Sequence, residues 1–320
     1  MPVLFVHHRT HYHYPNWVKG AANQIKLYPL PDDHQRLVEH RLVVSNDPEI
    51  FTIQDYFGNT TGFFTILRPH RELSIESFLR VEMSTKPLSE RHSTADVWKV
   101  LSSPAMKEQH HDYLNAEMNY HQQEVAQAVR LNSEEHPLEE LLRLSEYIYL
   151  NFEYKKGVTT IETGIDELWK LKAGVCQDFA HLLLYMMRLC GVPCRYVSGY
   201  ICPGTSEWRG EGATHAWVEA RLPDVGWIGI DPTNKCLAGE RHIRLAVGRN
   251  FIDCTPVKGT YIGSSEHLLE VTVQFSSSIF SDEQLIPKEI SLGQQMHFKQ
   301  GIAESYDAYM QRQQQQQQQQ

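Results

Sequence analysis

The sequence predicts an α+β fold, in which a small β-sandwich precedes a core of helices packed on an antiparallel sheet. Short runs rich in β-branched and aromatic residues, separated by turn signals, fill residues 1–83. Helical patterns dominate the middle of the chain. Strands joined by a tight turn follow at 215–231. Helices followed by antiparallel strands are typical of α+β proteins rather than of alternating α/β proteins.

Composition sets wide limits on function. The 320 residues suit one large or two medium domains, and 41% hydrophobic with 22% charged residues is ordinary for a globular protein. A net charge of −9 argues against a general nucleic-acid binder. No apolar run reaches the ~18–20 residues that span a bilayer, so no membrane partner is expected. The N-terminus lacks the pattern of a secretory signal peptide, so a cytoplasmic location is expected.

Six cysteines in a chain of this length do not indicate a disulfide scaffold. Cys190 and Cys194 have a spacing that could suggest zinc, but no second cysteine pair or histidine pair accompanies them. His7, His8, His11 and His13 cluster near the N-terminus, and we interpret them as solvated or hydrogen-bonded strand residues. No metal and no cofactor are expected.

The N-terminal 83 residues are expected to form the β-sandwich as a domain of their own. Proline, glycine and Asn-Asp signals separate its runs. The expected strands are Thr10–Tyr14, Gln35–Val44, Phe51–Tyr56, Phe63–Leu67 and Ser74–Glu82.

Residues 84–110 are expected to form a linker, and residues 111–275 the core. Amphipathic spacing and Pro137 in a first turn predict several helices. A helical patch after residue 241 and a strand at Leu268–Phe275 are expected to complete the core. Residues 276–320 form a C-terminal extension ending in Gln313–Gln320, which should be disordered. The helices expected before the central segment are His111–Leu131, one beginning at Pro137, and Ile165–Leu171.

The central segment begins at Gly174 and reads GVCQDFAHLLLYMMRLCGVPCRYVSGY. Its apolar spacing predicts a buried helix with Cys176 in the first turn, followed by a strand. A thiol there feels the positive end of the helix dipole, which favours the thiolate. Asp178 suits the same turn as a capping residue, and His181 is interpreted as structural.

A base and an orienting acid for this thiol are suggested by the later strands. His215 begins one strand and Asp231 ends the next, and the turn at 223–226 joins them. This hairpin would set His215 opposite Asp231, with both side chains on one face. Each residue alone is more often a buried, surface or turn residue. The order Cys, His, Asp, together with the hairpin, favours nucleophilic catalysis.

Three blocks of this sequence resemble one family. The segment beginning GVCQDFAH, then ATHAWVEA, then GWIGIDPTN look like bacterial transglutaminase-like proteins of the papain-like cysteine superfamily. The core resemblance covers about residues 140–240. HYHY, DYFGN and LSIES resemble the β-domain that precedes this core in such bacterial proteins. The resemblance implies Cys176 as nucleophile, His215 as general base and acid, and Asp231 as orienting acid.

The resemblance also implies acyl transfer through a thioester, with a protein or peptide as substrate. Peptide or amide hydrolysis is favoured over cross-linking of glutamine to an amine, because nothing marks an amine site. A non-catalytic binding module is the alternative from another class. Nothing in the sequence indicates an oligomeric state.

Oxyanion stabilisation is expected partly from the Cys176 backbone N–H. Animal transglutaminases add a tryptophan upstream of the cysteine, but Glu139–Ser145 contains none. Tyr154 or Trp169 could substitute. Gln177 and Trp217 are further candidates for the cleft, although Trp217 could equally lie in the core. Because no EF-hand-like acidic loop is found, calcium dependence is not expected.

Overall fold

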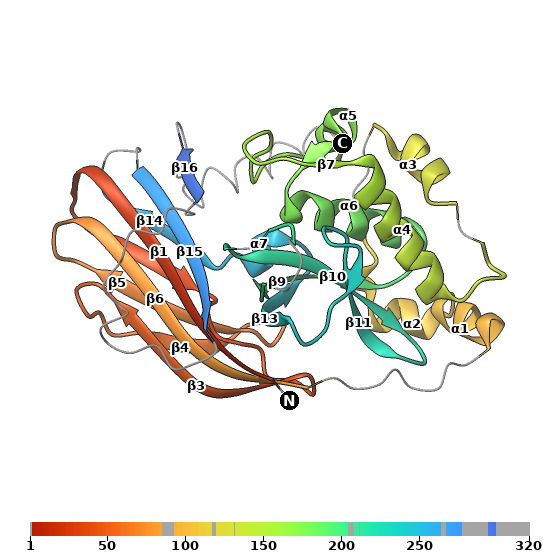
Figure 1. Cartoon of the computed structure of the whole chain (residues 1–320), viewed down its shortest axis with the longest axis horizontal. Coiled ribbons are helices and arrows are strands. Elements are labelled where there is room, and N and C mark those ends of the chain that lie inside the picture. Colours follow the sequence, from red (N-terminus) through yellow and green to blue (C-terminus); the bar gives the residue numbers. More distant parts are fainter. Residues whose placement is uncertain are drawn as a thin grey trace.

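The computed structural model describes residues 2–84, 93–116, 120–130, 132–203, 208–210, 212–263, 267–276 and 294–298. It confirms the predicted α+β class: a β-rich region on the left of Figure 1 packs beside a core of helices and sheet. The Gln313–Gln320 tract and most of the C-terminal extension lie outside the described residues. Among the described residues, no helix is both long enough and apolar enough to cross a membrane.

Strands come first along the chain, helices dominate its middle, and strands return after α6. In chain order the elements are β1 Val3–Val18, β2 Ala21–Ile25, β3 Gln35–Val44, β4 Phe51–Gln54, β5 Thr60–Ile66, β6 His70–Met83, α1 Thr94–Leu101, α2 Pro104–Gln109, the 3-10 helix η1 His111–Tyr113, α3 Gln122–Ala128, α4 Pro137–Asn151, β7 Glu153–Tyr154, α5 Ile165–Leu171, β8 Ala173–Gly174, α6 Cys176–Leu189, β9 Cys194–Ile201, β10 His215–Leu222, β11 Gly226–Asp231, β12 Cys236–Leu237, β13 His242–Gly248, α7 Phe251–Cys254, β14 Val257–Tyr261, β15 His267–Ser276 and β16 Gln294–Phe298.

Two sheets make up the β-rich region, in the orders β16-β15-β1-β6-β3 and β14-β2-β5-β4. Their inward-facing side chains alternate along the strands, most regularly in β6, and form one buried cluster that includes Val6, Ile25 and Ile75. Tyr200 and Ile243 of the core sheet join this cluster. The β-rich region and the core therefore share buried apolar surface.

Strands β14 and β15 belong to the β-rich region, although the sequence assigned them to the core. β15 pairs antiparallel with β1 from His13↔Leu268 to Phe5↔Ser276, and β14 pairs with β2. In Figure 1 the blue strand β15 lies beside the red strand β1. The expected core of residues 111–275 thus ends too late, because residue patterns identify a strand but not its partner across so much chain.

The helices are confirmed where their capping or apolar spacing was clear. α4 begins at Pro137, α5 is Ile165–Leu171, and α6 begins at Cys176. The expected linker 84–110 instead contains α1 and α2, which begin after the capping residues Ser93 and Ser103. The single helix expected over His111–Leu131 is wrong, since the described residues of this range form the separate η1 and the short α3.

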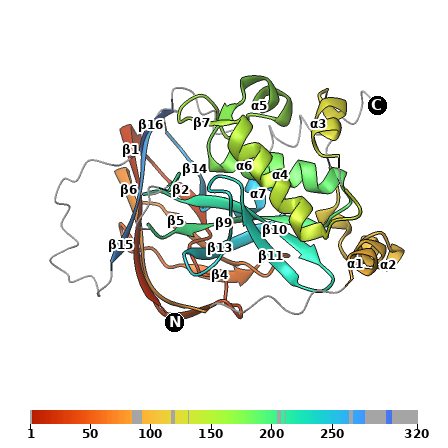
Figure 2. The same ribbon diagram turned by 45° about the vertical axis from the view of Figure 1, so that its right-hand side comes forward.

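The core sheet has the order β12-β11-β10-β9-β13, and α6 packs against β10 and β9 while α4 packs against both α6 and β11 (Figure 2). Phe179, Leu183 and Met187 of α6 are buried in one cluster with Ala216 and Val218 of β10. Burial on nearly every face explains why the helix is so continuously apolar.

The helical patch expected within residues 241–275 is reduced to the short α7, because β13 forms at His242–Gly248 and pairs with β9. All seven residues of β13 are buried, so the alternation that identifies a half-exposed strand is absent.

Two amide side chains connect the β-rich region to β13. Gln35 donates to the carbonyl of Arg244 and accepts from its backbone N–H, at 2.8 Å in both cases. Asn59 makes the same pair with Val247, also at 2.8 Å. Each amide replaces a missing strand partner for a buried peptide group at the edge of the core sheet.

Replacing Asn59 should reveal the strength of this connection. Asn59→Leu leaves a buried N–H and a buried carbonyl of Val247 without partners, so the free energy of unfolding should fall by at least about 2 kcal/mol. Urea unfolding of the wild type and of this variant would measure the loss of stability. Gln54→Leu is the control, because Gln54 is an exposed amide that bonds Thr60 locally. Equal losses in the two variants would contradict this role of Asn59.

Candidate active site

Cys176 occupies the first position of α6, directly after a tight backbone approach. The parallel pair of β7 and β8 sets Tyr154 level with Gly174, two residues before the thiol. A side chain at Gly174 would come within 2.7 Å of an Asp178 carboxylate oxygen. That oxygen accepts from the Val175 backbone N–H at 2.8 Å and from Thr159. Asp178 therefore caps the helix.

The β10–β11 hairpin differs in register from the sequence expectation. Val218 pairs with Ile230, so Asp231 lies level with Trp217 rather than with His215. Because the shift is two residues, the side chains of His215 and Asp231 still project from the same face. The turn ends one residue earlier than assumed, because Gly226 is already paired with Leu222.

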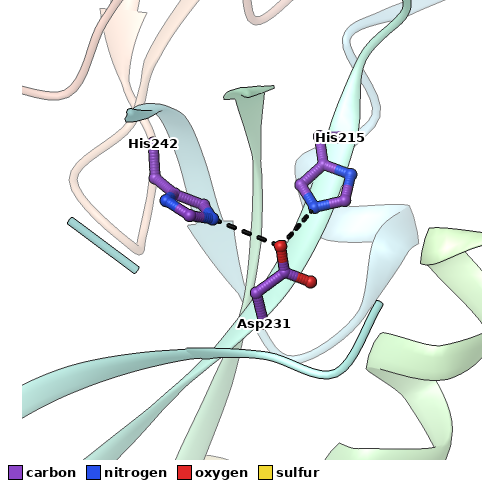
Figure 3. A group of neighbouring side chains, drawn as sticks. All are labelled: His215, Asp231 and His242. Atoms are coloured by element: carbon purple, nitrogen blue, oxygen red, sulfur yellow. Dashed lines mark hydrogen bonds and ion pairs between the residues drawn. The ribbon is translucent and has the colours of Figure 1, made fainter. Parts of the chain in front are cut away.

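His215 and Asp231 contact each other despite the shifted register. Nε2 of His215 lies 2.8 Å from Oδ2 of Asp231, and both side chains are fully buried (Figure 3). Burial alone lowers the pKa of His215. The Asp231 carboxylate and the Cys176 thiol outweigh burial and raise that pKa to about 10. His215 is therefore held as an imidazolium facing a carboxylate.

Asp231 receives five hydrogen bonds. Oδ2 accepts from His215, from Nε2 of His242 at 3.2 Å and from Nδ2 of Asn234 at 2.8 Å. Oδ1 accepts from the backbone N–H groups of Thr233 and Asn234. Burial raises the pKa of this carboxyl, but its donors, led by His215, hold it well below the usual range. The charge of Asp231 is thus stabilised inside the protein.

His242 is a member of this group that sequence reasoning missed. Its Nδ1 accepts from the Gly239 backbone N–H at 3.2 Å, so its Nε2 carries the proton donated to Asp231. Burial, the largest influence, lowers the pKa of His242, so this ring is neutral. The only available signal was a histidine at the start of an apolar run, and the wrong helical assignment of that run concealed it.

The thiol lies on the remaining side of the His215 ring. Since Asp231 occupies Nε2, Nδ1 is the nitrogen available to Cys176. Among the described residues, Nδ1 has no well-formed hydrogen bond, while the thiol is close enough to raise the pKa of His215. Resting contacts of this kind often tighten only when substrate binds.

The Tyr154 hydroxyl lies near the same side of the His215 ring. A side chain at Gly210 would be 2.8 Å from Nδ1 of His215 and 3.6 Å from the Tyr154 hydroxyl. Burial first, and then the Cys176 thiol, raise the pKa of Tyr154, so its hydroxyl stays protonated. Gly210 therefore packs directly against the His215 ring, with the Tyr154 hydroxyl nearby.

The other candidates are placed differently. Gln177 is half-buried in the first turn of α6. Trp217 is fully buried in a small cluster with Val197 and Val247, so it belongs to the core. The Trp169 indole N–H donates to Glu124 at 2.9 Å and is not available to the thiol. His181 accepts from a backbone N–H of α7, as a structural histidine would.

A metal could be considered at His215, Asp231 and His242, whose ligand atoms lie within 4.8 Å of one another. The Gly239 N–H leaves His242 Nε2 protonated, without a lone pair for a metal. The donor set therefore favours a hydrogen-bonded cluster. Cys190 and Cys194 bond to different carbonyls, those of Val129 and Leu184.

The N-terminal histidines also have ordinary partners. His7 pairs with Glu76 at 2.8 Å, and the buried His8 bonds Thr10 at 2.7 Å. Their bonding agrees with the interpretation of them as hydrogen-bonded strand residues.

Comparison with known sequences identifies the family of this chain. Residues 123–232, which contain Cys176, His215 and Asp231, match the core of the transglutaminase-like superfamily. Residues 4–82 match the bacterial transglutaminase-like N-terminal region. The uncharacterized protein Rv2569c of Mycobacterium tuberculosis is 34% identical over 286 residues, which are 84% of this chain and 90% of that protein. The chain belongs to the transglutaminase-like superfamily.

Two further relatives of this transglutaminase-like protein are informative. A structure named "Putative Cysteine Protease" from Cytophaga hutchinsonii matches 87% of this chain and 92% of that one, with a TM-score of 0.67 and 18% identity. At that identity the likeness shows the fold. A protein-glutamine gamma-glutamyltransferase of Pseudomonas aeruginosa is 33% identical over 84 residues, covering 24% of this chain and 13% of that protein.

The raised pKa of His215 predicts a pH dependence of stability. Its contribution is complete below the unfolded-state pKa of about 6.5 and is lost as the pH rises through about 10. The free energy of unfolding of the wild type should therefore fall relative to His215→Gln between pH 7 and 10, by more than about 1 kcal/mol. Urea unfolding across that range would measure the difference.

His181→Gln is the matched control. Burial, then Arg188, lowers the pKa of His181 to about 4, so its contribution changes below pH 6.5 and stays flat from pH 7 to 10. If the difference in free energy of unfolding between the wild type and His215→Gln is equally flat from pH 7 to 10, the charged pair of His215 and Asp231 is refuted.

Proposed function

We propose that this protein is a cysteine-dependent acyl-transfer enzyme acting on amide bonds through a thioester, most simply a peptidase or amidase. One observation carries the proposal: a thiol at a helix N-terminus lies beside a buried His215–Asp231 pair whose free ring nitrogen is on the thiol's side. Nucleophile, proton carrier and orienting acid are then Cys176, His215 and Asp231.

In the first half-reaction, the Cys176 sulfur attacks the amide carbonyl while Asp231 holds the imidazolium in place. The tetrahedral intermediate collapses, the C–N bond breaks, and the departing amine takes a proton from Nδ1 of His215. A thioester and a neutral imidazole result. Water or a second amine then loses a proton to Nδ1 and attacks the thioester, which restores the thiolate and the imidazolium.

The developing oxyanion has two candidate donors. The Cys176 backbone N–H is at the first helical position, where no intrahelical acceptor exists. The Tyr154 hydroxyl lies near the His215 ring and stays protonated, because burial and the nearby thiol raise its pKa. We therefore propose Tyr154 for the donor role that an upstream tryptophan has in animal transglutaminases.

The second nucleophile decides between hydrolysis and transamidation. The relative named as a protein-glutamine gamma-glutamyltransferase favours transamidation as the second candidate. We propose hydrolysis first, because water needs no site of its own. We also propose a protein or peptide substrate and a cytoplasmic location, which six free cysteines support.

Selective alkylation tests the state of the thiol. Burial, the largest influence, raises the pKa of Cys190 to about 12 and that of Cys194 to about 11. Iodoacetamide at pH 7 should therefore modify Cys176 at least about 10-fold faster than Cys190, as measured by peptide mass mapping. His215→Gln should slow modification of Cys176 and leave Cys190 unchanged. Equal rates at the two cysteines would count against the thiolate–imidazolium pair.

Removal of the nucleophile tests the reaction itself. Cys176→Ala should lower the release of amine from a peptide or glutamine-amide library by at least about 10³-fold, because no other group can form the thioester. Cys190→Ala, a half-buried cysteine in the same helix region, is the control and should retain activity. Mass spectrometry with and without an added primary amine separates hydrolysis from cross-linking. Release of amine by Cys176→Ala at the wild-type rate would overturn the assignment of Cys176 as the nucleophile.

A further inference from the structure

The segment Trp208–Gly210 lies beside the His215 ring of the proposed site. Gly210 has a positive φ of 89° and leaves no room for a side chain against Nδ1 of His215. Arg209 is held through its backbone: its N–H donates to Oδ1 of Asn234 at 2.9 Å, and its carbonyl accepts from Nδ2 at 3.2 Å. The same Nδ2 donates to Asp231. Arg209 is thus fixed relative to the catalytic carboxylate.

The half-buried Arg209 side chain lies against α4 and near Tyr154. Its guanidinium carbon lies 4.1 Å from the centre of the Tyr149 ring on α4. The guanidinium also acts electrostatically on the Tyr154 hydroxyl, on which the Cys176 thiol acts as well. A planar cation held on an aromatic face loses little freedom when it binds a second group.

One nitrogen of this guanidinium makes no hydrogen bond to the residues that the structure describes. Nη1 of Arg209 is inaccessible to solvent and makes no hydrogen bond within the described part of the chain. Some other partly buried arginines have carboxylates, since Arg195 and Arg244 share Glu219 and Arg143 pairs with Glu140, whereas Arg188 bonds to backbone carbonyls. No ion pair to Arg209 is found among the described residues, although a buried donor without an acceptor is costly.

We propose that Arg209 binds a carboxylate of the substrate and so makes the enzyme selective for acidic acyl donors or leaving groups. This inference rests on the proposed function, because the carboxylate belongs to the same substrate whose amide Cys176 attacks. The fork of a guanidinium matches a carboxylate with two parallel hydrogen bonds. The carboxylate comes either from an acidic side chain on the acyl part or from a free C-terminus on the leaving part.

Two pairs of compounds distinguish these sources. Peptidyl acyloxymethyl ketones that differ only in Glu or Gln beside the electrophile report on the acyl part, through the labelling rate of Cys176. Peptides with a free C-terminal carboxylate or a C-terminal amide report on the leaving part, through release of the last residue. In the wild type, the acidic member of at least one pair should react about 10- to 100-fold faster.

Arg209→Gln should reduce that preference to less than about 3-fold, and Arg209→Lys should restore part of it. Arg241→Gln is the matched control, because Arg241 lies 5.2 Å from the Trp208 ring of the same segment. It should keep the full preference. Iodoacetamide labelling of Cys176 in every variant would show that the fold and the thiol are intact.

The outcomes separate this inference from the function on which it rests. If neither ketone labels Cys176 in the wild type and no peptide is cleaved, the proposed function fails. If acidic and neutral compounds react equally, or if Arg209→Gln keeps the preference, carboxylate recognition by Arg209 is overturned while the cysteine chemistry stands. If Arg241→Gln also loses the preference for acidic compounds, that preference depends on the segment as a whole rather than on Arg209. This outcome also overturns the inference.

Discussion

The buried charge of Asp231 is the constraint on which the arrangement around it depends. A carboxylate without solvent access is stable only when donors surround it. Here they come from two histidines, from an asparagine side chain and from two backbone N–H groups in the turn after β11. Satisfying one anion therefore fixes β10, β13 and the turn relative to one another. Through Asn234 it also fixes the backbone of Arg209.

Local patterns in the sequence were sufficient for much of this fold and site. Capping and apolar spacing identified the helix that begins at Cys176, because those signals lie within a few residues. The hairpin brought His215 and Asp231 onto one face even though its register was two residues off, since alternation repeats every second residue. Tyr154 was a weak candidate by sequence, and only the pairing of β7 with β8 shows how near it lies.

What the sequence could not supply depends on contacts between distant segments. His242 reaches Asp231 from β13, a strand that is buried on both faces and so lacks the alternation of exposed and buried residues. Trp217 fills space left by Gly199 and Gly229, and a glycine's empty volume is invisible without its neighbours. The strands that pair with β14 and β15 lie near the N-terminus, and local sequence patterns do not identify pairing partners so distant in the chain.

Those two strands make the core an insertion within the β-rich region. Met83 ends β6 and Val257 begins β14, so everything between them is synthesised before the two sheets can be completed. At translation rates of about 5–20 residues per second, the first strands wait on the order of ten seconds or more for β14 and β15. During that interval β1 exposes the edge that β15 later covers. The helical core can therefore assemble on the ribosome ahead of the region that precedes it in sequence, and a fragment ending before residue 257 would keep that edge unpaired.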